Sequence, residues 1–165
     1  MTKCVQEGEL NGKINIPPSK SDGQRTILAA ALSKGISKIL NIGESDDEQT
    51  MLRNVQLLGA EVKVNGSELT ITGINHFPEN IVLNAGESGL GLRLLASICA
   101  AHDGTHSLIG EGSILKRDQS FFEKHFPKMG IQVISNHGKL PLELKGKLQP
   151  TDYTVDGSES SQYIS

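Results

Sequence analysis

The feature that most constrains the fold is an internal repeat, in which two stretches of the chain predict the same order of elements. The run LGAEVKVNGSELTITG (residues 58–73) resembles MGIQVISNHGKLPLELKG (residues 129–146), and each predicts a hairpin around a turn rich in Asn and Gly. Upstream of both runs, apolar periodicity predicts a strand, a helix, a second strand and a second helix. The first unit is predicted as strand 13–16, helix 24–34, strand 37–42, a helix from Ser45 to Leu58, and strands 60–64 and 68–72. The second is predicted as strand 81–83, helix 92–101, strand 106–109, helix 118–128 with Pro127 at its end, and strands 131–134 and 140–144.

A third unit begins near the end of the chain. Residues 153–155 are strand-like, and DGSESS (residues 156–161) has the composition of a helix start. We therefore expect an α/β (α+β) fold of repeated β-α-β-α-β-β units, with units at about 13–73 and 81–146 and a truncated one at 153–165. The alternative is a generic α/β domain with coincidental internal similarity and a disordered tail.

Composition narrows the function classes. The net charge is −3, the charges are mixed along the chain, aromatic residues make up 4% of it and Trp is absent. This argues against a nucleic-acid-binding module, which would show a basic stripe or a stacking surface. The first residues are polar, so no signal peptide is expected, and the run 90–101 is too short to span a bilayer.

The cysteines and histidines predict no metal site. Cys4 and Cys99 are far apart, and we expect both to be reduced, with Cys99 in the core, as in a cytoplasmic protein. The histidines lack metal-ligand spacing and are expected on the surface or in loops. They are His76, His102, His106, His125 and His137.

Each unit places a Gly- or Ser-rich stretch between its first strand and its first helix. These stretches are PSKSDGQR (18–25), GESGLGLR (86–93) and DGSESSQ (156–162). Helix N-termini bind phosphate and carboxylate groups through unpaired N–H groups. Lys20 and Arg25 add full charges, so converging stretches would form an anion-binding pocket, although each Ser could serve only as a helix cap. Neither a Walker A pattern nor a Rossmann glycine motif is present.

Three stretches resemble motifs of the EPSP synthase family. Residues 18–25, followed by LAAAL (28–32), are similar to its P-G-S-K-S-x-S-N-R-x-L-x-L-A-A-L pattern, with Pro18 in place of Gly. The run Ser45-Asp46-Asp47 resembles its S-D-D element, and DGSESSQY (156–163) resembles D-G-S-x-S-S-Q-[FY]. The resemblance covers essentially the whole chain. The related UDP-N-acetylglucosamine enolpyruvyl transferases have a different lysine motif and a reactive-cysteine loop, neither of which is present here.

The resemblance implies a fold of two similar domains with three such units each and the active site between them. Residues 13–165 would then be an incomplete domain, and residues 1–12 a strand that could belong to the other domain. It also implies a transferase of the shikimate pathway, which leads to chorismate and the aromatic amino acids. The full-length protein would be a cytoplasmic monomer without a cofactor. It would move the enolpyruvyl group of phosphoenolpyruvate to the 5-hydroxyl of shikimate 3-phosphate, whereas this chain alone is expected to be inactive.

The resemblance also implies residue roles. Lys20 would be catalytic and contact both substrates. The residues implied for shikimate 3-phosphate are Lys20, Ser21, Arg25, Ser160, Ser161 and Gln162, and those implied for phosphoenolpyruvate are Lys20, Gly89, Arg117 and Gln162.

Two motifs depart from the family pattern. The family's G-N-A-G-T-A-x-R-P aligns with residues 86–94, where Glu87 replaces Asn and Leu90 replaces Thr; a rival register begins at Asn84 but loses the Arg spacing. Its G-x-x-R-M-x-x-R-P becomes GEGSILKRD (110–118), where Ser113 stands at an arginine implied to bind phosphoenolpyruvate. The alternative function is therefore a divergent, non-catalytic relative that binds an anionic metabolite.

Overall fold

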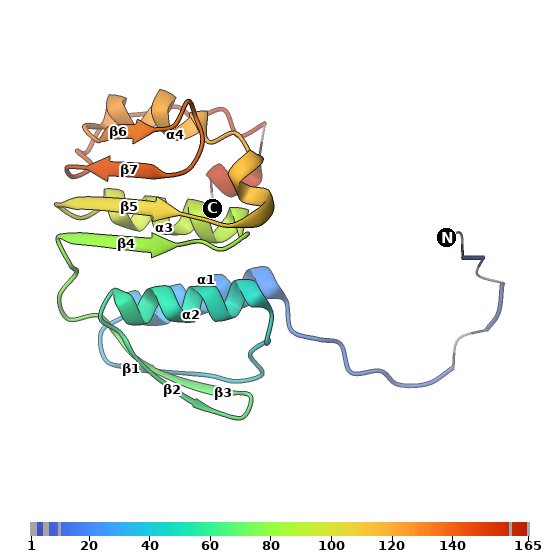
Figure 1. The fold of residues 1–165 in the computed structure, drawn as a ribbon. Helices are drawn as coiled ribbons and strands as arrows, with labels where there is room; N and C mark the ends of the chain where they lie inside the picture. Colours follow the sequence, from blue (N-terminus) through green and yellow to red (C-terminus); the bar gives the residue numbers. More distant parts are fainter. Residues whose placement is uncertain (1–2, 5–6, 10, 159, 165) are drawn as a thin grey trace.

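The computed structural model describes residues 3–4, 7–9, 11–158 and 160–164. The chain forms two stacked subdomains, one for each predicted repeat, and residues 11–19 extend away from both (Figure 1). Helices α1 and α2 lie between the sheet of the first unit and strand β4 of the second (Figure 1). This mixed helix and sheet architecture confirms the predicted fold class.

The first unit contains two capped helices and a three-stranded sheet. Its elements are α1 (Lys20–Leu32), β1 (Ile36–Ile39), α2 (Asp46–Leu57), β2 (Glu61–Asn65) and β3 (Glu68–Thr72). Helix α1 begins earlier than predicted, because the Ser19 hydroxyl accepts a hydrogen bond from the Asp22 backbone N–H. Helix α2 begins at its predicted start, where Ser45 and Glu48 form a capping box.

The second unit repeats this order with an added strand. Its elements are β4 (Asn80–Asn84), α3 (Gly89–Ala100), β5 (Thr105–Ile109), η1 (Gly112–Lys116), α4 (Ser120–His125), η2 (Phe126–Met129), β6 (Gln132–Ser135) and β7 (Leu142–Lys145). Helix α3 also begins earlier than predicted, because Ser88 caps it. The predicted helix 118–128 is shorter than expected: α4 ends before Pro127, which lies in the 3-10 turn η2.

The two sheets follow the repeat. The first has the order β1-β3-β2 with antiparallel pairs, and the second has the order β4-β5-β7-β6 with a parallel β4–β5 pair. Strand β1 therefore corresponds to β5, and its outer edge is the place where a counterpart of β4 would pair. Among the described residues, no strand occupies that edge.

The apolar faces of all four helices and both sheets form one continuous core, which includes Ile27, Met51, Ile71, Leu95 and Leu108. Cys99 is buried in it, as predicted, and burial raises the pKa of its thiol to about 12. Cys4 is exposed, and both cysteines are free.

The prediction that every histidine lies on the surface or in a loop is wrong for His106. This residue lies in β5 and is fully buried. Its Nε2 lies 3.2 Å from the Pro78 carbonyl oxygen, and its ring makes an edge contact with Phe77. The imidazole therefore occupies a core position of the strand.

Two predicted strands are absent from the described residues. Residues 13–16 are extended but unpaired, with Ile14 and Ile16 exposed, and residues 153–155 are also unpaired. The helix expected from residues 156–161 is replaced by one 3-10 turn, η3 (Ser161–Tyr163). Each segment has strand-like residues but no neighbouring strand to supply ladder hydrogen bonds.

None of the helices in the described part of the chain combines the length and the apolar character needed to cross a bilayer.

Candidate functional site

The starts of α1 and α3 meet at a cleft of about 350 Å³. The first turn of α1 contributes Lys20 and Ser21, that of α3 contributes Gly89, and η3 contributes Gln162. The full lining is Lys20, Ser21, Gln24, Asp47, Glu87, Ser88, Gly89, Leu90, Ser113, Arg117 and Gln162. Helices α1 and α3, which have 13 and 12 residues, thus direct the positive ends of their dipoles toward one cleft.

A buried hydrogen bond joins these two helix starts. The Ser88 hydroxyl donates to Gln24 Oε1 at 2.7 Å and accepts from the Gly91 backbone N–H at 3.0 Å. Gln24 and Ser88 are 1% and 3% exposed, so losing one partner would leave either the Gln24 Oε1 acceptor or the Ser88 hydroxyl donor unpaired in the protein interior. The pair therefore fixes the spacing of the two helix N-termini.

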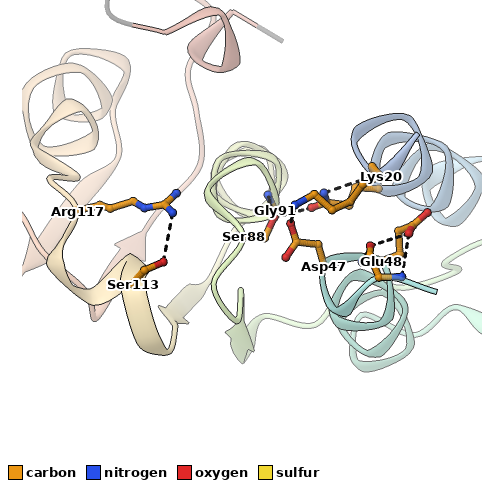
Figure 2. A network of polar contacts seen from close by, with 9 residues as sticks. Lys20, Asp47, Glu48, Ser88, Gly91, Ser113 and Arg117 are labelled. Atoms are coloured by element: carbon orange, nitrogen blue, oxygen red, sulfur yellow. Dashed lines mark hydrogen bonds and ion pairs between the residues drawn. The ribbon is translucent and has the colours of Figure 1, made fainter. Parts of the chain in front are cut away.

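Lys20 is held at the cleft by an ion pair. Its Nζ lies 2.9 Å from Asp47 Oδ2 in the first turn of α2, and Figure 2 shows the pair beside the capping residue Glu48. The Lys20 side chain is 56% exposed and that of Asp47 only 18%. The ammonium group therefore remains open to the cleft, but its charge is partly offset.

The second cation of the cleft, Arg117, lies across α3 from Lys20 (Figure 2). Its Nη2 donates to the Ser113 hydroxyl at 3.2 Å. Glu87 reaches the same segment, since it accepts from the Ser113 backbone N–H at 2.7 Å. That hydrogen bond, the Ser113 hydroxyl and the Arg117 charge hold the pKa of Glu87 below its ordinary value. Glu87 therefore carries a negative charge beside Arg117 at neutral pH.

The structure brings together five of the predicted site residues: Lys20, Ser21, Gly89, Arg117 and Gln162 all line the cleft. Three others lie outside its lining. The Arg25 guanidinium donates back to the Ser21 carbonyl along α1, and the Ser160 hydroxyl caps η3 by accepting from the Gln162 N–H. Ser161 is exposed at the start of that turn.

A larger hollow of about 530 Å³ adjoins this cleft and shares Asp47 and Glu87 with it. Its other charged residues are Asp46, Glu111 and Arg53, and the Arg53 guanidinium donates to the Thr50 hydroxyl. Four carboxylates against one arginine make the hollow unsuited to an anion. The smaller cleft is therefore the better candidate for the predicted anion site.

Two residues without a predicted role, Asp47 and Arg93, contact residues of the cleft. Asp47 belongs to the predicted S-D-D element but has no predicted role, yet it pairs with Lys20. Arg93 was used only to align a motif, yet its guanidinium contacts both Gly89 and Gln162. The spacing of Arg93 from Gly89 is the signal that could have predicted this contact. Residues four apart on a helix share a face, and Gly89 is predicted to contact phosphoenolpyruvate.

Among the described residues, no group of three or more His, Cys, Asp or Glu side chains is arranged to hold a metal ion.

Comparisons with known proteins point to one family. A family model described as EPSP synthase (3-phosphoshikimate 1-carboxyvinyltransferase) matches residues 5–165. A 3-phosphoshikimate 1-carboxyvinyltransferase from Clostridium beijerinckii is 37% identical over 97% of this chain, and one from Clostridioides difficile is 34% identical over 97%. The solved structure of EPSP synthase from Acinetobacter baumannii superposes with a TM-score of 0.80 at 25% identity over 93% of this chain.

This chain is much shorter than those proteins. It covers 39% of the length of both the C. beijerinckii and the C. difficile relatives, and 36% of the A. baumannii chain.

Proposed function

The chain belongs to the EPSP synthase family, and we propose that a protein containing it transfers the enolpyruvyl group of phosphoenolpyruvate to the 5-hydroxyl of shikimate 3-phosphate. The observation that carries this proposal is the cleft itself, where Lys20, Arg117 and two helix N-termini face one space. Both substrates are anions with a phosphate and a carboxylate group. Fixed cations and helix dipoles are suited to bind such groups.

The proposed role of each residue is based on its position relative to the cleft and on the family motif to which it belongs. Lys20 is the catalytic residue of this part of the protein and contacts both substrates. Ser21, Arg25, Ser160, Ser161 and Gln162 join it around shikimate 3-phosphate. Gly89, Arg117 and Gln162 join it around phosphoenolpyruvate. Arg25, Ser160 and Ser161 lie outside the cleft lining, so their roles require the larger ligand to extend beyond the cleft.

The chemistry places negative charge between these groups. The 5-hydroxyl group loses its proton as its oxygen bonds to C2 of phosphoenolpyruvate, and C3 takes up a proton, which gives a tetrahedral intermediate. Loss of one proton from the C3 methyl group and of phosphate from C2 then restores the double bond. Prepositioned cations stabilise the charge that develops on the phosphate and carboxylate oxygens. The acid and base for the proton steps are proposed to lie in the rest of the full-length protein, since this chain covers 39% of the length of the C. beijerinckii relative.

The same proposal extends to the organisation of the protein. Residues 13–165 form an incomplete enolpyruvyl transferase domain, and residues 1–12 belong to a strand of the other domain. The exposed Ile14 and Ile16 and the open edge of β1 support the incomplete domain, because apolar extended segments and unpaired strand edges are normally covered. The assignment of residues 1–12 falls partly on residues 1–2, 5–6 and 10, which lie outside the described residues. The full-length protein is proposed to be a cytoplasmic monomer that works without a cofactor.

One observation favours a second candidate, a non-catalytic relative that binds an anionic metabolite. Ser113 occupies an arginine position of the family motif, and Glu87 adds a negative charge at the same segment. If the phosphoenolpyruvate site is merely weakened, Ser113→Arg will raise the affinity for phosphoenolpyruvate. An unchanged affinity would instead favour a rebuilt site.

The decisive test is a chimera. Residues 1–165 replace the matching part of the C. beijerinckii relative, and phosphate release is measured with both substrates. We expect release that depends on both substrates and is lost in Lys20→Met. The matched control is Lys38→Met, because Lys38 makes an exposed ion pair with Glu68 away from the cleft.

Binding to the 165-residue chain keeps the test informative if the chimera does not fold. Titration calorimetry with shikimate 3-phosphate should show binding that Lys20→Met weakens and Lys38→Met does not. A folded chimera that binds both substrates without releasing phosphate would favour the non-catalytic candidate. A chain that binds neither substrate would contradict the proposal.

A further inference from the structure

Arg93 connects the start of α3 with the turn η3. Its Nη1 donates to the Gly89 carbonyl oxygen at 2.8 Å and to Gln162 Oε1 at 2.8 Å. Its Nη2 lies 3.3 Å from the Tyr163 hydroxyl oxygen. One guanidinium group thus joins α3 to two residues that lie 69 and 70 positions further along the chain.

The turn that carries Gln162 is fixed on a second side by aromatic contacts. The Tyr163 ring stacks on Phe121 of α4, with centroids 3.7 Å apart and planes 9° apart. Arg93 Cζ lies 4.6 Å from the centroid of the Tyr163 ring, within the range of a cation–π contact. These contacts hold the backbone of η3, so that the remaining freedom of Gln162 lies in its side chain.

The chemistry of the two groups decides how that side chain is oriented. A guanidinium group has five N–H donors and no acceptor, whereas a carboxamide has an acceptor oxygen and a donor NH2 group. Only the oxygen of Gln162 can bond to Arg93, and the positive charge strengthens that bond. The NH2 group must then point away from Arg93. Among the described residues, none accepts a hydrogen bond from it, although Gln162 lines the cleft.

We propose that Arg93 is a positioning residue, which fixes the Gln162 amide so that its NH2 group donates hydrogen bonds to an anionic substrate in the cleft. This inference rests on the proposed function, because it takes shikimate 3-phosphate as the ligand. With the amide reversed, Gln162 would turn the lone pairs of its oxygen toward a phosphate or carboxylate group. Arg93 prevents that orientation without needing to touch the substrate itself.

The test distinguishes the role of the acceptor oxygen of the Gln162 amide from that of its donor NH2 group. Gln162→Glu keeps an acceptor for Arg93 but removes the donor, whereas Arg93→Met removes the orienting group and leaves the donor present. Arg53→Met is the matched control, because Arg53 donates a hydrogen bond to the Thr50 hydroxyl in the neighbouring hollow and does not line the cleft. Each variant of the 165-residue chain is titrated with shikimate 3-phosphate, and its melting temperature is measured.

We expect Arg93→Met to weaken binding by about tenfold, which corresponds to about 1.4 kcal/mol and to the loss of one oriented hydrogen bond to a charged group. Gln162→Glu should weaken binding at least as much while keeping a wild-type melting temperature. If Arg93 had only a structural role, the affinity of each variant would fall only as far as its melting temperature falls. Wild-type affinity in either variant would overturn the inference.

A ligand-free measurement keeps this inference separate from the proposed function. The side-chain NH2 resonances of Gln162 are assigned in a 15N spectrum by their absence in Gln162→Glu. They should shift in Arg93→Met but not in Arg53→Met. A chain that binds no shikimate 3-phosphate would contradict the proposed function, whereas unmoved Gln162 resonances in Arg93→Met would overturn the orienting role of Arg93.

Discussion

At the scale of single residues, Glu87 opposes the chemistry of the cleft that it lines. Its carboxylate accepts from the Ser113 backbone N–H and stays ionised, because its pKa is held below the ordinary value. It therefore places a negative charge beside Arg117, in a site proposed for two anions. Its hydrogen bond also holds the segment that carries Arg117, so removing the charge and removing the contact should have different effects.

Glu87→Gln should accordingly strengthen anion binding, because the amide oxygen can still accept from Ser113 while the charge is lost. We expect the affinity of the chain for phosphoenolpyruvate to rise by roughly two- to tenfold at low salt, with a smaller gain at high salt. Glu79→Gln is the control of equal charge at the opposite end of β4. Unchanged or weaker binding in Glu87→Gln, measured by calorimetry, would show that the Glu87 charge does not oppose the ligand.

His106 predicts how stability depends on pH. Burial lowers its pKa below 6.5, outweighing the Pro78 carbonyl, and the neighbouring charge of His102 acts in the same direction as burial. The unfolded chain therefore binds a proton at a higher pH than the folded chain. The contribution of neutral His106 is fully present above about pH 7, and it is lost as the pH falls from there toward the folded pKa.

We expect the free energy of unfolding in urea to be lower at pH 5.5 than at pH 7.5. His106→Leu should reduce this difference, although it also leaves the Pro78 carbonyl without its partner. His137→Gln, which changes an exposed turn residue, should keep the wild-type difference. The same pH dependence in His106→Leu and in the wild type would assign the effect to other groups.

At the scale of elements, α1 and α2 pack closely because Gly23 faces Glu48. The Glu48 side chain is 1% exposed, and it accepts from the Gly43 and Ser45 backbone N–H groups. A Cβ atom at position 23 would lie 2.9 Å from Glu48 Cδ and closer still to its Oε1. The first turn of α1, which carries Lys20 and Ser21, is therefore set directly against the capping box of α2.

Gly23→Ala should destabilise the chain by about 1–3 kcal/mol, the usual cost of overpacking, even though Ala favours a helix over Gly by about 1 kcal/mol. Urea unfolding measures the change. Gly8→Ala is the control, since nothing lies within 4 Å of a Cβ atom at that position. A Gly23→Ala chain at least as stable as the wild type would mean that Glu48 leaves its buried position at little cost.

The elements that the sequence predicted well are those whose signals are local. The helix start at Ser45 and the hairpin turn at Gly66 are set within a few residues, and both appear in the structure as predicted. The caps Ser19 and Ser88 are equally local, but the helices they start begin earlier than predicted. The strands predicted at 13–16 and 153–155 depend instead on a neighbouring strand, which no local pattern reveals. The same limit applies to the site, because the pairs Lys20–Asp47 and Arg93–Gln162 form only through the packing of separate elements.

At the scale of the whole molecule, the proposed function makes the cleft one side of a binding site. It opens to solvent and contains two cations, Lys20 and Arg117, together with the carboxylates of Asp47 and Glu87. Two substrates that each carry a phosphate and a carboxylate need more positive charge than this, and they need it from more than one side. The relatives, of which this chain covers 39%, have more than half of their length in which to place those groups.

The 165-residue chain alone should therefore bind shikimate 3-phosphate but release no phosphate when phosphoenolpyruvate is added. Bound substrate would face water on the open side, where charge developing in the tetrahedral intermediate is stabilised less than between fixed cations. The chimera with the C. beijerinckii relative is the positive control, and Lys20→Met of the isolated chain reports any contaminating activity. Phosphate release by the isolated chain that Lys20→Met abolishes would show that this part of the molecule already contains a complete catalytic site.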